Sequence, residues 1–124
     1  MTQNIKPVYL LAGGRHGRGK KQDPLLQTVY HESGINSPTI AYSGTASGDD
    51  KNFFNFISVE LKEAGAGKVT HAVIAPEGAD IKKAQAILKS ADIIFISVGD
   101  VEAGMDILRE KNMIGFLADL YRQG

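Results

Sequence analysis

The chain has no cysteine, no tryptophan and no net charge, and it has no long hydrophobic run. The count of 0 Cys excludes disulfide frameworks, cysteine-ligated metal sites and cysteine nucleophiles. Lys+Arg 14 balances Asp+Glu 14, so the charge gives no reason to expect a nucleic acid or an anionic membrane as partner. No apolar run approaches the roughly 20 residues of a membrane-spanning helix, and the N-terminus lacks the regions of a signal peptide. We therefore expect a cytoplasmic protein.

Length and composition predict one globular domain over residues 1–124. The chain is 43% hydrophobic and 23% charged, which is ordinary for a folded protein. A domain of this size buries enough surface to form a packed core without disulfides or metals. The same length suits a complete small domain and equally suits half of a larger one.

Short, largely apolar runs alternate with longer amphipathic segments along the chain. The runs predict strands at residues 8–12, 39–42, 69–75 and 93–98. Helices are predicted after Asp23-Pro24, after the capping-box spacing of residues 47–50, after Asp80 and over two segments beyond Asp100. Continuous apolar strands are typical of a parallel sheet covered on both faces. We predict an α/β, flavodoxin-like fold with a parallel sheet of at least four strands and helices on both faces.

Ligands of such sheets bind beyond the carboxyl ends of the strands, which selects the loops at residues 13–21, 43–48, 76–78 and 97–100. The first loop has the glycine and lysine spacing of a Walker A loop, but Lys21 stands where magnesium binding needs serine or threonine. It is either a solvated basic loop, a nucleotide site, or a loop that attracts an acidic substrate group. Its basic and imidazole side chains are Arg15, His16, Arg18, Lys20 and Lys21.

The serines and histidines form no catalytic or metal-binding pattern. Neither Ser43 nor Ser47 has the G-x-S-x-G spacing of a nucleophile elbow, and Ser47 is expected to cap a helix by accepting a backbone N–H. The histidines at 16, 31 and 71 lack the spacing of a metal motif, so we expect no metal and no cofactor. His71 is expected to be a strand-end residue with a hydrogen-bond partner.

The turn at residues 97–100 follows the most apolar strand and precedes a predicted helix. Backbone N–H groups near Gly99 are placed to point at an anion or a developing oxyanion. The alternative is a tight turn in which Asp100 only caps the next helix.

Four segments together resemble one family. They are residues 8–14, residues 45–49 with the phenylalanine-rich helix to Gly65, residues 91–100, and residues 115–124. The chain resembles the class I glutamine amidotransferase-like hydrolases, and within them the serine peptidases typified by cyanophycinase and aspartyl dipeptidase. In that family, the segment resembling residues 120–124 is followed by a strand and a Gly-x-Ser-Ala-Gly elbow with the nucleophile, and the histidine and acidic partners come later. No triad member is therefore assigned to this chain.

The resemblance implies that the Gly99 backbone contributes to the oxyanion hole. Together with the basic loop, it makes Asp100, Gly13, Gly14 and Arg15 the expected substrate-binding residues. Val98 stands where the family has the first glycine of a pair, and a β-branched residue restricts the backbone there.

Two functions follow from these observations. The first is the N-terminal part of a serine peptidase or hydrolase that lacks its nucleophile, is inactive alone and serves a small peptide-like or anionic substrate. The alternative is a self-contained, non-catalytic module that binds a small anion or a protein partner. An uncovered sheet edge in the first case also predicts a homodimer.

Overall fold

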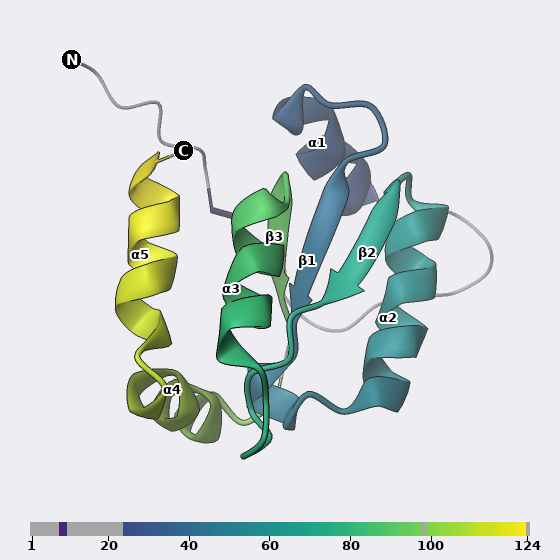
Figure 1. The fold of residues 1–124 in the computed structure, drawn as a ribbon. Helices are drawn as coiled ribbons and strands as arrows, with labels where there is room; N and C mark the ends of the chain where they lie inside the picture. The colour runs from purple at the N-terminus through teal and green to yellow at the C-terminus, as the bar shows by residue number, and fades with distance from the viewer. Residues whose placement is uncertain (1–7, 10–23, 98, 124) are drawn as a thin grey trace.

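In a computed structural model of the protein, residues 8–9, 24–97 and 99–123 are described (Figure 1). They form five α-helices, one short 3-10 helix labelled η1, and one parallel sheet of three strands in the order β2-β1-β3. The elements are α1 Pro24–Ser33, β1 Thr39–Ser43, η1 Thr45–Ser47, α2 Lys51–Glu63, β2 Lys68–His71, α3 Ile81–Ser90, β3 Ile93–Ile96, α4 Val101–Glu110 and α5 Met113–Gln123.

The sheet confirms the predicted α/β class and the parallel strands. Ile40 in the central strand β1 is paired with Val69 of β2 on one side and with Ile93 of β3 on the other. The number of strands differs from the prediction, because the described residues hold three rather than at least four. Of the predicted strand at residues 8–12, only Val8 and Tyr9 are described, and neither is in a strand.

Helices cover both faces of the sheet, as predicted. Because successive side chains of a strand point to opposite faces, Ile40 and Tyr42 enter one core while Ala41 enters the other. The first core joins β1 to α1 and α2, and its other buried members are Leu26, Tyr30, Leu61, Ala64 and Val69. The second core joins β1 to α3 and α5, and its other buried members are Ala72, Ile74, Ala84, Leu88 and Met113. Figure 1 shows α1 and α2 on one side of the strands and α3 and α5 on the other.

The predicted strand at residues 69–75 is too long, because β2 ends at His71. The following backbone bonds to side chains instead of a neighbouring strand. The Asp49 carboxylate accepts from the N–H groups of Ile74 (2.8 Å) and Ala75 (2.6 Å). The Lys111 ammonium donates to the carbonyls of Ile74 (2.7 Å) and Pro76 (2.6 Å). These bonds satisfy buried polar groups that a β-ladder otherwise pairs.

The helix signals in the sequence are mostly confirmed, with one correction. Asp80 caps α3 as predicted, and Asp100 caps α4 as the alternative for the turn at residues 97–100 has it; each accepts from the N–H group three residues later. The cap of α2 is Asp50 rather than Ser47, whose Oγ instead donates to the Gly44 carbonyl at 3.0 Å. The reason is the turn at Gly48, whose φ of 71° ends η1 before α2 begins.

No helix among the described residues combines the length and the apolar character that crossing a membrane requires.

Candidate functional site

The carboxyl edge of the sheet between β1 and β3 brings two of the predicted loops together. The chain leaves β1 through α2 to reach β2 on one side, then crosses through α3 to β3 on the other. This reversal of strand order makes the edge between β1 and β3 the topological switch point, where such folds bind ligands. The Ser97 N–H donates to the Ser43 carbonyl at 2.9 Å, and the Asp100 N–H donates to the Ala46 carbonyl at 2.8 Å.

Glycines allow this close approach of backbone to backbone. A Cβ at Gly99 would lie 2.3 Å from the Ala46 carbonyl oxygen, and a Cβ at Gly104 in α4 would lie 3.0 Å from the Ala46 Cα. The carboxylate of Asp100 accepts from the Ala103 N–H at 3.1 Å and so caps α4. Gly99 and Asp100 therefore lie together at the switch point.

The other predicted site residues lie elsewhere in the chain. Gly13, Gly14 and Arg15, with the rest of the basic loop, are outside the described residues, and so is Val98.

Several hydroxyl groups gather at this edge, and we call them the hydroxyl cluster. Its members are Tyr42, Ser43, Thr45, Ser47 and Ser97. Ser43, Thr45 and Ser97 are buried, and the hydroxyls of Ser43 and Thr45 are 3.2 Å apart. Of these residues, only Ser43, Ser47 and Ser97 are candidates from the sequence, because they stand in the loops at 43–48 and 97–100.

The phenol of Tyr42 is the one aromatic hydroxyl of the cluster. Its oxygen is buried, and no group among the described residues meets it with normal hydrogen-bond geometry. Burial raises the pKa of Tyr42 above its ordinary value; the nearby hydroxyls of Ser97 and Ser47 act against this, while the carboxylates of Asp49 and Asp50 add to it. The phenol is therefore neutral at physiological pH.

A buried aspartate and a histidine lie beside the cluster, and the sequence reasoning did not connect them. Asp49 Oδ1 accepts from the Gly44 N–H at 3.1 Å and lies 3.1 Å from His71 Nε2. The side chain of Asp49 is fully buried, and that of His71 is 12% exposed. His71 therefore has the hydrogen-bond partner that was predicted. In the sequence, Asp49 belongs to the capping-box spacing of residues 47–50. Nothing in its spacing from His71 indicates that the two side chains are in contact.

The described residues hold no complete Ser/His/acid arrangement. A hydroxyl nucleophile needs a general base within hydrogen-bond reach. The hydroxyls of Ser43 and Thr45 contact each other, and Ser47 donates to a backbone carbonyl. Nor does this part of the chain contain a group of three or more His, Asp or Glu side chains suited to a metal ion.

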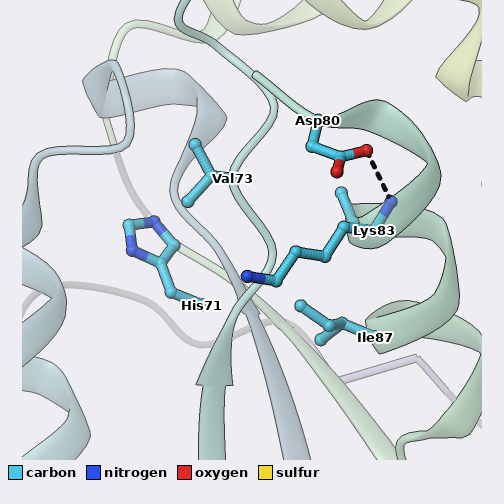
Figure 2. A pocket seen from close by; sticks show the side chains of 6 residues that line it. His71, Val73, Asp80, Lys83 and Ile87 are labelled. Carbon is cyan, nitrogen blue, oxygen red and sulfur yellow. Dashed lines mark hydrogen bonds between the residues drawn. The ribbon is translucent and has the colours of Figure 1, made fainter. Parts of the chain in front are cut away.

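A pocket of about 200 Å³ opens at the other edge of the sheet, between β2 and α3 (Figure 2). His71 forms one side of it and residues of α3 form the other. Its lining consists of His71, Val73, Asp80, Lys83, Ala84 and Ile87. Figure 2 shows the Lys83 side chain extending toward His71 and away from the Asp80 carboxylate.

Comparisons of the chain with protein-family models, with curated proteins and with solved structures give no match.

Proposed function

We propose that this chain is the scaffold part of a serine hydrolase of the class I glutamine amidotransferase-like kind, acting on peptide bonds. In this proposal a further strand, which carries the nucleophile, adds to the outer edge of β3. The sheet then has at least four strands. The chain alone is inactive, and the intact hydrolase works in the cytoplasm.

The observation that carries the proposal is the incomplete cover of β3. Ile93, Ile94 and Phe95 are only half-buried and Ile96 is 63% exposed, whereas Ile40, Ala41 and Tyr42 of β1 are at most 1% exposed. The only strand paired with β3 among the described residues is β1. A strand of four apolar residues in a parallel sheet is normally covered on both faces and flanked by neighbours.

The turn after β3 supports the proposal as well. A strand that runs parallel to β3 ends beside Gly99 and Asp100, so a nucleophile at its end lies next to this turn. The backbone N–H of Gly99 then stabilises the oxyanion, an effect typically worth about 3 kcal/mol per donor. Gly99 has no side chain to obstruct the site, and a Cβ at this position would clash with the backbone of Ala46.

The proposed substrate is a small peptide with an acidic group. Arg15 and its basic neighbours supply the charge that attracts it, and Gly13, Gly14 and Asp100 complete the substrate site. In the absence of the added strand, we propose that two copies of the chain pair through β3 as a homodimer.

The association of the chain tests this proposal. We expect the full chain to dimerise with increasing concentration in light scattering. We expect Ile96→Lys to abolish the dimer, because a charged residue on an edge strand opposes pairing. Val59→Lys is the matched control, because Val59 is 55% exposed on α2 and away from β3.

Hydrogen exchange adds a second measurement. The Ser97 N–H donates to Ser43 of β1, and Tyr42 is paired with Phe95 in the parallel register. By alternation, the amides of Ile94 and Ile96 therefore face away from β1. These two amides should exchange rapidly in the monomer and slowly in the dimer. A chain that stays monomeric while both amides exchange slowly has its β3 edge already covered, and that result would overturn the scaffold proposal.

The pocket beside β2 favours a second candidate function, a self-contained module that binds a small ligand. A well-behaved monomer in the association test supports this candidate.

A further inference from the structure

The pocket between β2 and α3 lies where parallel sheets bind ligands. His71 is the last residue of β2 and Val73 follows it, so the pocket is at the carboxyl end of that strand. Its other side is the first half of α3, where Asp80 is the N-cap and Lys83 and Ile87 are one turn apart. The pocket is at the opposite edge of the sheet from β3, so nothing in it depends on the hydrolase scaffold.

Two opposite charges line the pocket without pairing with each other. Asp80 Oδ1 accepts from the backbone N–H of Lys83 at 3.1 Å, but its carboxylate forms no ion pair with the Lys83 ammonium. Among the described residues, no group forms a hydrogen bond or an ion pair with that ammonium. Figure 2 shows the two charged groups on different sides of the pocket, with Val73, His71 and Ile87 around them.

The pocket also has aliphatic walls and one aromatic wall, and the aromatic wall is held in place by its neighbours. Val73 and Ile87 present aliphatic surface to the pocket, and the buried Ala84 also lines it. The ring of His71 is fixed by Asp49 and stacks on Phe54 with centroids 4.5 Å apart. A wall that is already rigid costs little conformational entropy when a ligand binds.

We propose that this pocket binds a free aliphatic α-amino acid with a short branched side chain. The Lys83 ammonium contacts its carboxylate, the Asp80 carboxylate contacts its amino group, and Val73 and Ile87 contact its side chain. A ligand with only one charge leaves one of the two pocket charges without a partner, so the pocket selects a zwitterion.

Titration of the isotope-labelled full chain with L-valine, followed by amide NMR, tests the proposal. We expect saturable shifts at residues 71–73 and 80–87, with a dissociation constant on the order of 1 mM, as suits a ligand of few atoms. Two probes lack one charge each: 3-methylbutanoate is valine without the amino group, and 2-methylpropylamine is valine without the carboxyl group. Each should bind at least about fivefold more weakly than valine.

Three variants test which pocket side chain contacts each charged group of valine. Lys83→Met and Asp80→Asn should each weaken valine binding at least about fivefold, and asparagine still caps α3. Lys82→Met is the matched control, because Lys82 is the exposed neighbour that does not line the pocket. Asp80→Asn should not weaken the binding of 3-methylbutanoate, because that probe has no amino group to contact Asp80.

Three results would each overturn the proposal. They are the absence of saturation with valine up to 50-fold above the expected constant, equal affinity for valine and for either single-charge probe, and equal losses in Lys82→Met and Lys83→Met. The amide spectra of the free variants show directly whether each remains folded, so a loss of binding is not confused with unfolding.

Discussion

At the scale of single residues, Asp49 connects the loops that follow β1 and β2. Its Oδ1 accepts from the Gly44 N–H and contacts His71 Nε2, while its Oδ2 accepts from the N–H groups of Ile74 and Ala75. A carboxylate with two acceptor oxygens satisfies all these groups, and an amide with one oxygen cannot. The unusual φ of 58° at Asp49 is tolerated because these bonds hold it in place.

We expect Asp49→Asn to lower the free energy of unfolding by about 3 kcal/mol, since buried donors would then face an NH₂ group. Asp50→Asn is the matched control; Asp50 is exposed, and asparagine caps a helix as well as aspartate does, so the loss should be under about 0.5 kcal/mol. Urea unfolding of both variants measures the difference. Equal losses in the two variants would show that the Asp49 contacts contribute no special stability.

Tyr42 gives a prediction about pH. Burial raises the pKa of its phenol above the ordinary value of 10.0, so the folded protein holds this proton more tightly than the unfolded chain does. The resulting stability is complete below pH 10 and is lost as the pH rises from there through the folded-state pKa. We expect Tyr42→Phe to remain more stable than the wild type in this alkaline window.

At neutral pH the same substitution should change the unfolding free energy by less than about 1 kcal/mol, because the buried hydroxyl has no hydrogen-bond partner of normal geometry among the described residues. Urea unfolding of both proteins at pH 7 and at pH 10.5–11.5 checks both statements. Parallel losses of stability with rising pH in the two proteins would contradict the assignment to Tyr42.

At the scale of elements, local signals predict the helices well and the ends of strands poorly. Asp80 and Asp100 each cap the helix that the sequence assigns to them, because a cap depends on residues only a few positions apart. The end of β2 depends on Asp49 and on Lys111, which lies 37 positions after Ile74. A contact of that separation leaves no periodic pattern in the sequence.

The candidate site follows the same rule as the elements: its local features are predictable from the sequence, and its contacts between distant residues are not. The strand-end rule selects the loops of Ser43 and Gly99, and the structure brings these two loops together at the switch point. It could not show that His71 pairs with Asp49, because that pairing depends on how the turn at Gly48 orients the carboxylate. The pocket at Lys83 likewise arises only when α3 packs beside β2.

Two glycines in different elements should respond oppositely to alanine. A Cβ at Gly99 meets the Ala46 carbonyl, whereas a Cβ at Gly115 in α5 meets nothing within 4 Å. We expect Gly99→Ala to destabilise the protein by about 2 kcal/mol or more through displacement of the turn. Gly115→Ala should stabilise it by about 0.5–1 kcal/mol, because alanine is the better helix former. Thermal unfolding of both variants measures this pair, and a stabilised Gly99→Ala protein would contradict the close contact with Ala46.

At the scale of the whole molecule, zero net charge and an uncharged β3 edge act together. The sequence pI is about 6.8, so electrostatic repulsion between copies is weakest near neutral pH. We expect the association of the full chain to be strongest near that pH and to weaken on either side. Light scattering between pH 5.5 and 9 at constant ionic strength measures this profile.

Variants of opposite charge at Ile96 distinguish the effect of the β3 edge on association from the effect of net charge. Ile96→Lys moves the pI upward and Ile96→Glu moves it downward, but both place a charge on the exposed end of β3. If β3 is the contact, both variants should associate less than the wild type at every pH. If net charge alone controls association, the pH of strongest association should rise in Ile96→Lys and fall in Ile96→Glu, and both variants should associate as strongly as the wild type at that pH. That result would place the contact elsewhere on the molecule.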